Sequence, residues 1–282
     1  MENILKHSDH LIDLALAEDF GQPGDITTLA TIPEEKEGEA VLIAKADGII
    51  CGLELFERVF LKLNEQIMTE VYVKDGDRVK KGDRILMLKG SLRAILMGER
   101  TALNFIQRLS GIATFSAELA EIVSGSNTKI LDTRKTLPGF RLLDKYAVKT
   151  GGSDNHRIGL YDMFMIKDNH IEAAGSITEA VKRVKSYRIA NNLTAAIEVE
   201  VKNSTELQEA LAAEVDVIML DNMNNQQIAE CVQINNRRSK LEVSGNVTAE
   251  RVRELVTIGV DYISLGALTH SVKAFDLSLL VR

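Results

Sequence analysis

The segments "TAAIEVEV" (residues 194–201) and "VDVIMLD" (residues 215–221) decide the fold of this chain. Each is a short apolar run rich in Val and Ile, with an acidic residue at or next to its end, and such runs are typical of buried strands. Four further runs look alike: "TKILD", "DMFMIK", "KLEVSG" and "VDYISLG". Because helical patterns separate most of the later runs, the second part of the chain predicts repeated strand–helix units with parallel strands.

Polar residues and glycines end these predicted strands. In chain order they are Lys167, Glu200, Asp221, the tripeptide Ser244-Gly245-Asn246 and the tripeptide Leu265-Gly266-Ala267. In a (β/α) barrel the C-terminal strand ends converge on one mouth, whereas in an open doubly wound sheet they spread along a line. If these residues act in one site, the strand ends must converge. This favours an α/β barrel over residues 116–282.

Residues 1–115 indicate a separate N-terminal domain of mixed α/β type, on which a C-terminal segment of the chain could pack back. A helix is expected over residues 11–18 and another over residues 92–124, with strand-like segments between them. The segment "VYVKDGDRVKKGDRILMLKG" (residues 71–90) alternates apolar and polar residues around two Asp-Gly or Lys-Gly turns, which predicts short strands. This segment resembles the hammerhead of biotinyl and lipoyl carrier domains. It carries no lysine in their exposed modification tripeptide, so a structural β-module is preferred, with a carrier module as the non-enzyme alternative.

Composition excludes several classes of function. The chain has 282 residues, a formal charge of −7 and 5% aromatic residues, with no Trp. A nucleic-acid partner is not expected, because such proteins usually carry a broad basic face and stacking aromatics. No apolar run approaches the ~20 residues that span a bilayer, and the N-terminus lacks the pattern of a signal peptide. Two cysteines without close spacing suggest a reducing compartment, so we expect a cytoplasmic protein.

One local segment carries a net positive charge, although the chain as a whole is acidic. From residue 129 to residue 157 there are seven Lys or Arg residues and three acidic ones. The candidate anion-binding side chains here and at the following strand end are Arg134, Lys135, Arg141, His156, Arg157 and Lys167. A charge run is usually a solvated face, but Pro138-Gly139 and Gly151-Gly152 interrupt this one and indicate loops. Arginine and lysine in such loops suit carboxylate and phosphate oxygens.

The glycine turns and the two strand-end carboxylates point to phosphate and a divalent cation. Gly245 and Gly266 follow late strands and precede helices, a place where barrels often bind phosphate, although each could simply form a tight turn. Glu200 and Asp221 end neighbouring strands, and carboxylates of this kind suit Mg²⁺, although each could equally be a helix cap or an ion-pair partner. The residues alone thus predict a barrel that binds a phosphorylated, carboxylate-rich small molecule with Mg²⁺.

Several long collinear motifs resemble those of the quinolinate phosphoribosyltransferases, also called carboxylating nicotinate-nucleotide pyrophosphorylases. They are "EDFGQPGDITT", "ERTALNFIQRLSGIAT", "DTRKTLPGFRLLDKYAVKTGGSDNHRIGLYDMFMIKDNHI", "IEVEV", "IMLDN", "EVSGN" and "ISLGALTHS". The resemblance covers nearly the whole chain. It implies an N-terminal α/β sandwich beside an incomplete α/β barrel, in a homodimer with shared sites. It also implies transfer of phosphoribose from 5-phosphoribosyl-1-pyrophosphate to quinolinate with loss of CO₂, a step of NAD synthesis.

Carried over by motif, the resemblance assigns a role to each candidate residue. Arg134, His156, Arg157 and Lys167 would hold the quinolinate carboxylates, with Arg100 donated by the other subunit. Lys135, Glu200 and Asp221 would act on the phosphoribosyl pyrophosphate, and Mg²⁺ would bind the two carboxylates. The remaining substrate-binding residues are Thr133, Ser244, Gly245, Asn246, Leu265, Gly266 and Ala267. Two rivals are a nicotinate-using transferase, for which this many cations would be excessive, and the molybdenum-transport-associated homologue, which "KDNHI" and "EVEV" fit less well.

Overall fold

The chain separates into two compact units. The structure is a computed structural model that describes the backbone of residues 2–282 and the side chains of residues 8–282. The N-terminal unit contains Met1–Ala117, Thr136–Gly152 and Thr269–Arg282, and the barrel unit contains Glu118–Lys135 and Ser153–Leu268. The predicted limits of 1–115 and 116–282 lie close to the first of these divisions. The two later segments, residues 136–152 and 269–282, group with the N-terminal residues.

A four-stranded antiparallel sheet forms the centre of the N-terminal unit, with the strand order β12-β1-β5-β3. Its strands are β1 (Glu37–Ala44), β3 (Met68–Val71), β5 (Arg84–Ser91) and β12 (Leu277–Val281). The last strand of the chain pairs with the first, so that Val41 lies opposite Leu280. A two-stranded ladder of β2 (Gly48–Ile49) and β4 (Arg78–Val79) lies outside this sheet.

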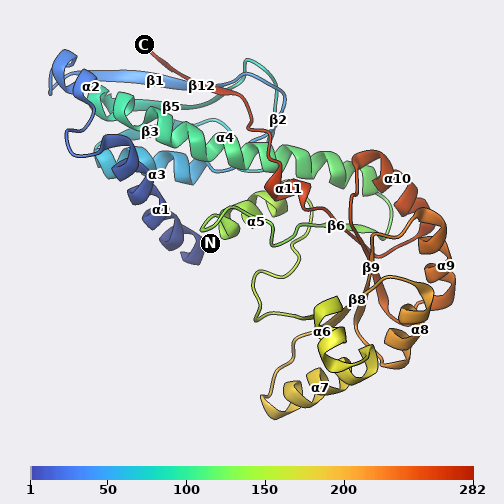
Figure 1. The fold of residues 1–282 in the computed structure, drawn as a ribbon. Coiled ribbons are helices and arrows are strands. Elements are labelled where there is room, and N and C mark those ends of the chain that lie inside the picture. The colour runs from blue at the N-terminus through green and yellow to red at the C-terminus, as the bar shows by residue number, and fades with distance from the viewer. Residues whose placement is uncertain (1) are drawn as a thin grey trace. The chain divides into compact units, whose positions relative to one another are not determined.

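Helices cover one face of this sheet and make the N-terminal unit an α/β sandwich (Figure 1). The helix α3 (Leu53–Leu63) buries Phe56 and Phe60, whose ring centroids are 5.1 Å apart. It packs closely on α4 (Leu92–Val123), because a Cβ at Gly98 would lie only 2.8 Å from the Phe60 ring. The other helices of this unit are α1 (Glu2–Phe20), α2 (Ile26–Thr31) and α5 (Arg141–Thr150).

The hammerhead-like segment is part of this sandwich. Residues 71–90 contribute the end of β3, all of β4 and most of β5, and the turns at Gly76 and Gly82 have φ values of 96° and 98°. The strand β5 is a central strand, since it pairs with both β1 and β3. A free carrier module would not lend a central strand to a larger sheet, so the structural interpretation of this segment is confirmed.

The barrel unit contains a six-stranded parallel sheet in the order β6-β11-β10-β9-β8-β7. Its strands are β6 (Lys129–Leu131), β7 (Phe164–Ile166), β8 (Ile197–Val201), β9 (Val217–Asp221), β10 (Lys240–Ser244) and β11 (Tyr262–Ser264). Each strand neighbours the next one in the chain, and the last pairs with the first, except that β6 and β7 form no ladder among the described residues. A single bridge from Leu131 to Asp154 stands at that gap. The sheet is therefore the incomplete barrel that the sequence predicts.

Helices on the outside of the strands complete the barrel unit, as Figure 1 shows for α8, α9 and α10. Their bounds are α6 (Asp168–Ala174), α7 (Ile177–Ala190), α8 (Ser204–Ala212), α9 (Asn225–Asn235), α10 (Ala249–Ile258) and, at the end, the short α11 (Ala267–His270). Polar N-caps begin four of them: Ser176, Asn203, Asn224 and Thr248 each accept a backbone N–H of the first turn. Such caps stabilise a helix by about 1 kcal/mol each and are readable in the sequence.

Local differences from the sequence-based expectations are small. The first helix covers Glu2–Phe20, well beyond the predicted residues 11–18, and the predicted helix 92–124 ends at Val123. At the start of α7, Ser176 accepts the Glu179 N–H at 3.1 Å, whereas the Glu179 carboxylate lies 3.4 Å from Lys182. Ser176 and Glu179 have the spacing of a capping box, but only the half that the Ser176 side chain makes is formed there.

Candidate active site

A cavity of about 490 Å³ opens at the C-terminal ends of the parallel strands, in the size range of small-molecule sites. Every strand of the barrel unit, or the loop after it, contributes a lining residue. The lining residues are Thr133, Arg134, Lys135, His156, Arg157, Met165, Lys167, Glu200, Met219, Asp221, Glu242, Ser244 and Ser264. The barrel therefore brings together nine of the residues selected from the sequence.

Two arginines in this cavity form no ion pair with a carboxylate among the described residues. The Nε atom of Arg134 is buried and has no hydrogen-bond acceptor within the described part of the chain. The Arg157 guanidinium contacts only the Met163 carbonyl at 3.4 Å and the Met165 sulfur at 3.3 Å. Burial and the neighbouring Arg134 lower the pKa of Arg157 from its ordinary value, as expected for two close cations. This arrangement leaves donors and positive charge available for an anion.

Carboxylates stand on the adjacent strands β8 and β9. The Lys167 Nζ lies 2.9 Å from Glu200 Oε2, and the Glu200 side chain is mostly buried. Asp221 accepts a hydrogen bond from Asn222 Nδ2 at 2.8 Å. Glu200 and Asp221 both line the cavity, and hard oxygen donors of this kind fit Mg²⁺. The prediction that they end neighbouring strands is confirmed by the β8–β9 ladder.

His156 is held against two buried glutamates, of which Glu242 also lines the cavity. Its Nε2 lies 3.2 Å from Glu198 Oε2 and 3.3 Å from Glu242 Oε1, and both glutamates are fully buried. Ser264 Oγ donates a hydrogen bond to Glu242 Oε1. The His156 backbone N–H donates to Asp132 Oδ1 at 2.8 Å, which fixes the main chain at this point. We call His156, Glu198 and Glu242 the buried charge cluster.

The charge state of this cluster follows from two opposing effects. Burial on its own lowers the pKa of His156, but Glu198 and Glu242 outweigh it and raise the pKa to about 10. Burial also raises the pKa of Glu198, against the opposing effect of His156. The backbone N–H of Arg157 donates a hydrogen bond to His156 Nδ1 at 2.8 Å, and this contact favours a neutral ring with no proton on Nδ1.

The cavity also contains residues that the sequence analysis did not select. Met165, Met219, Glu242 and Ser264 line it, and Glu198 lies beneath it. Each of the five stands two positions before a selected strand-end residue. Side chains in a strand alternate between the two faces, so residues two apart point the same way. Extending the strand-end argument back by two residues would have found this second layer.

Seven selected residues do not line the cavity, five of them in the two tripeptides and two in the N-terminal unit. Within the two tripeptides at the ends of β10 and β11, Ser244 lines it, whereas Gly245, Asn246, Leu265, Gly266 and Ala267 do not. Gly245 and Asn246 have φ values of 97° and 48°, so the chain turns there through the left-handed region. A Cβ on Gly245 would lie 2.2 Å from Asn222 Oδ1, and glycine is therefore required by space as well as by φ.

Two selected cations belong to the N-terminal unit. Arg100 is exposed on α4 and lines a cavity of about 400 Å³ with residues of α1, including Leu11 and Asp19. Arg141 begins α5, where its Nε lies 3.3 Å from Thr136 Oγ1. Neither is among the residues that line the cavity of the barrel unit.

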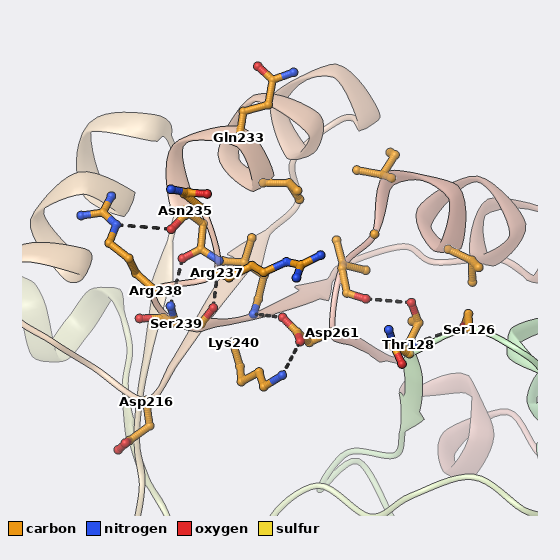
Figure 2. A pocket seen from close by; sticks show the side chains of 18 of the residues that line it. Ser126, Thr128, Asp216, Gln233, Asn235, Arg237, Arg238, Ser239, Lys240 and Asp261 are labelled. Carbon is orange, nitrogen blue, oxygen red and sulfur yellow. Dashed lines mark hydrogen bonds and ion pairs between the residues drawn. The ribbon is translucent and has the colours of Figure 1, made fainter.

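A larger cavity of about 1020 Å³ lies at the other ends of the strands, among the loops that precede β6, β9, β10 and β11 (Figure 2). Several of its charged groups already have a partner within the barrel unit. Lys240 lies 2.6 Å from Asp261, and Arg238 donates to the carbonyls of Ile234 and Asn235. The charged side chains that converge on one cavity and could take part in a reaction lie instead at the C-terminal strand ends, where barrels carry their active sites.

Comparison with known proteins gives the family. Residues 25–110 match the family described as "Quinolinate phosphoribosyl transferase, N-terminal domain", and residues 112–280 match its C-terminal domain. The chain belongs to the quinolinate phosphoribosyltransferase family. The resemblance inferred from the motifs is thereby confirmed.

Individual members of this family are similar along most of their length. A decarboxylating quinolinate phosphoribosyltransferase (2a, mitochondrial) of Nicotiana tabacum is 46% identical, with 95% of this chain and 80% of that protein covered. A probable carboxylating nicotinate-nucleotide pyrophosphorylase of Bacillus subtilis is 45% identical, with coverages of 95% and 91%. The solved nicotinate-nucleotide pyrophosphorylase of Francisella tularensis is 43% identical with a TM-score of 0.93, with coverages of 98% and 96%. This likeness confirms the mixed α/β fold with its two sheets.

None of the described helices is long and apolar enough to cross a membrane.

Proposed function

We propose that this chain transfers the phosphoribosyl group of 5-phosphoribosyl-1-pyrophosphate to the nitrogen of quinolinate, giving nicotinate mononucleotide, pyrophosphate and CO₂. The reaction is a step of NAD synthesis. One observation carries the proposal beyond family membership. Arg134, Arg157 and Lys167 line one cavity, and the buried Nε–H of Arg134 has no acceptor among the described residues. A dicarboxylate ligand supplies the carboxylate partners that the two arginines lack among the described residues, whereas the monocarboxylate nicotinate would leave part of the positive charge unused.

The two substrates divide the cavity between them in this proposal. The quinolinate carboxylates bind to Arg134, Arg157 and Lys167, with His156 below them. Phosphoribosyl pyrophosphate lies near Lys135, Glu200 and Asp221, and the turns after β10 and β11 bind its 5-phosphate. Thr133 supports Lys135, since the Lys135 N–H donates to its Oγ1 at 3.1 Å.

The residues of the chain stabilise charge as the reaction proceeds. As pyrophosphate leaves, positive charge develops on the ribose C1, and the carboxylates of Glu200 and Asp221 stabilise it. Lys135 stabilises the negative charge of the departing pyrophosphate. Attack by the ring nitrogen gives a pyridinium, and this ring stabilises the electron pair released when the adjacent carboxylate leaves as CO₂. A proton from water then adds to the carbon that carried the carboxylate. In the free protein Lys167 and Glu200 form an ion pair. When the substrates bind, contacts with them replace this pair, so that both side chains can interact with the substrates.

We also propose that Mg²⁺ is the cofactor and that Glu200 and Asp221 hold it. These are oxygen donors on adjacent strands in a cavity that also contains Lys135, which fits a metal bound together with phosphate oxygens. When bound, Mg²⁺ supplies charge neutralisation for the pyrophosphate leaving group.

The assembly and location belong to the same proposal. We propose a homodimer in which Arg100 of one subunit completes the site of the other, because Arg100 is an exposed cation of the N-terminal unit. A cytoplasmic location agrees with two free cysteines, both buried, although the Nicotiana relative named above is mitochondrial.

Incubation of the purified protein with quinolinate, phosphoribosyl pyrophosphate and Mg²⁺ tests the proposal. Nicotinate mononucleotide and CO₂ should form in equal amounts, and nicotinate in place of quinolinate should give no product. A Lys135→Ala variant should lose most turnover, whereas the matched Lys182→Ala change on the exposed surface of α7 should not. Absence of the nucleotide, or equal use of nicotinate, would overturn the assignment.

A further inference from the structure

The side chain of Arg251, in the first turn of α10, joins the turn after β9 to the turn after β10. Its Nη2 donates to the Met223 carbonyl after β9, and its Nη1 donates to the Gly245 carbonyl after β10 at 3.2 Å. Its Nε donates to Asn225 Oδ1, at the start of α9, at 3.2 Å. One guanidinium thus spans both turns, and its planar arrangement of donors fixes their relative position.

Arg251 is itself held in place by the start of its own helix. Thr248 is the N-cap of α10, and its Oγ1 accepts the Arg251 backbone N–H at 3.3 Å. The helices α9 and α10, which begin after the two turns, lie next to each other on the outside of the strands (Figure 1). Arg251 is half-buried, and the three acceptors named above are neutral groups, two carbonyls and one amide. These contacts fix the guanidinium without neutralising its charge.

Asn222 makes a second connection between the same two turns. Its backbone N–H donates to the Ser244 carbonyl at 3.0 Å, and its Nδ2 donates to Asp221 Oδ2 at 2.8 Å. Its φ of 54° lies in the left-handed region, which Asn adopts more readily than most residues. A Cβ on Gly245 would lie 2.2 Å from Asn222 Oδ1, so no space remains between the two turns at this point.

These connections lie directly beside the cavity of the barrel unit. Asp221 and Ser244 are the last residues of β9 and β10, and both line the cavity. The two turns continue from them, so any movement of one turn against the other would also move the Asp221 carboxylate relative to the turn after β10. Groups that are held in their binding positions before a ligand arrives bind it more tightly, because less freedom is lost on binding.

We propose that Arg251 and Asn222 are positioning residues that hold the Asp221 carboxylate and the turn after β10 at a fixed separation, so that both contact one phosphorylated ligand. The identity of that ligand as phosphoribosyl pyrophosphate rests on the proposed function, with its ribose near Asp221 and its 5-phosphate at the turn. The connection between the turns rests only on the contacts given above. Neither positioning residue has to touch the ligand.

Two simpler roles for Arg251 make different predictions. If Arg251 only stabilises the fold, its removal should weaken the binding of both substrates together with the stability of the chain. If only its positive charge attracts the phosphate, Arg251→Lys should bind phosphoribosyl pyrophosphate as well as the wild type does. The positioning role predicts that lysine fails, because its single ammonium cannot reproduce the planar set of donors.

Hydrogen exchange measured by mass spectrometry, without substrate, tests the connection itself. In Arg251→Ala, the peptides that cover residues 220–227 and 243–250 should exchange faster, whereas the peptide that covers residues 263–270, after β11, should not change. Asn222→Gly permits the left-handed backbone and removes only the side chain, and it should affect the same two peptides. Unchanged exchange in both variants, or faster exchange throughout the barrel unit, would overturn the proposal. This measurement does not depend on the proposed function.

Calorimetry with each substrate separately tests the positioning role. Arg251→Ala should raise the Kd for phosphoribosyl pyrophosphate about tenfold or more, on the scale of one lost hydrogen bond to a charged group. The Kd for quinolinate should stay within about threefold, because Arg134, Arg157 and Lys167 are not attached to these turns. Arg251→Lys should be as weak as Arg251→Ala. Full recovery with lysine, or equal losses for the two substrates, would refute the positioning role.

A matched control and a double variant complete the experiment. Arg253→Ala removes an exposed arginine two positions further along α10 and should change neither exchange in the two turns nor binding. Arg251→Ala combined with Asn222→Gly should lose less affinity than the sum of the two single losses, since either change already releases the turns. Losses that simply add would show that the two residues do not act together. If the wild type binds no phosphoribosyl pyrophosphate, the proposed function fails, while the hydrogen-exchange result still decides whether the turns are connected.

Discussion

Arg157→Ala is the sharpest single test of how the cavity recognises its substrate. The guanidinium contacts only a carbonyl and a thioether within the chain, and no carboxylate among the described residues forms an ion pair with it. Removing the Arg157 side chain therefore leaves no carboxylate without its ion-pair partner among the described residues. It also removes one of two repelling cations. We expect the free energy of unfolding to change by no more than about 0.5–1 kcal/mol, as for an ordinary surface substitution.

The loss in substrate binding should be much larger. Truncating one partner of a buried charged pair costs about 2–5 kcal/mol. Arg134 and Lys167 remain in the cavity, and the cavity is open to water, so we expect the lower half of this range. A loss of about 2–3 kcal/mol raises the Kd for quinolinate roughly 30-fold to 150-fold, since each 1.4 kcal/mol is tenfold.

Calorimetry with each substrate separately is the assay. Quinolinate binding should weaken by the stated factor, whereas phosphoribosyl pyrophosphate binding should change by less than about threefold, or roughly 0.7 kcal/mol. Arg183→Ala removes an exposed arginine of α7 and is the matched control, with no expected change for either ligand. Equal losses for the two substrates, or a loss that follows a lower unfolding temperature, would refute the assignment of Arg157 to quinolinate.

The other predictions concern the metal, the dimer and a turn. The double change Glu200→Gln, Asp221→Asn should preserve folding by circular dichroism and remove most turnover, and near wild-type turnover at saturating substrate would show that both residues are only structural. Arg100→Ala and Lys135→Ala should each be nearly inactive, yet refolding them together should return about a quarter of wild-type sites by two-fold symmetry. No recovery despite confirmed subunit exchange would exclude the shared site. Gly245→Ala should destabilise the chain by about 1–3 kcal/mol through its positive φ and raise the KM for phosphoribosyl pyrophosphate, and unchanged urea denaturation would contradict this reading of the turn.

The sequence by itself determined the barrel and most of its mouth. Short Val- and Ile-rich runs alternating with capped helices have few solutions other than parallel strands covered by helices. Once the strands are parallel and closed into a barrel, their ends must converge. Lys167, Glu200, Asp221 and Ser244 could therefore be assigned to one cavity without coordinates, and the structure confirms that they line it.

The sequence suggested that a C-terminal segment packs back on the N-terminal domain, but the tertiary structure decided which strand it pairs with and which other segment joins that unit. The pairing of β12 with β1 joins residues at opposite ends of the chain, and nothing in "LSLLV" indicates its partner. Similarly, residues 136–152 lie between two strands of the barrel unit in sequence but group with the N-terminal unit. Pairing between distant segments depends on the whole arrangement of the chain, whereas sequence patterns report mainly local preference.

The buried charge cluster shows the same division within the site. The alternation in "IEVEV" places Glu198 and Glu200 on one face, so their common direction was readable from the sequence. Their different environments were not: Glu200 contacts Lys167 at the open cavity, whereas the fully buried Glu198 contacts His156. Charge state and pKa depend on burial and on neighbours from β7, β10 and the loop after β6. Because those neighbours are brought together only by closing the barrel, the chemistry of Glu198, Glu242 and His156 is a property of the tertiary structure.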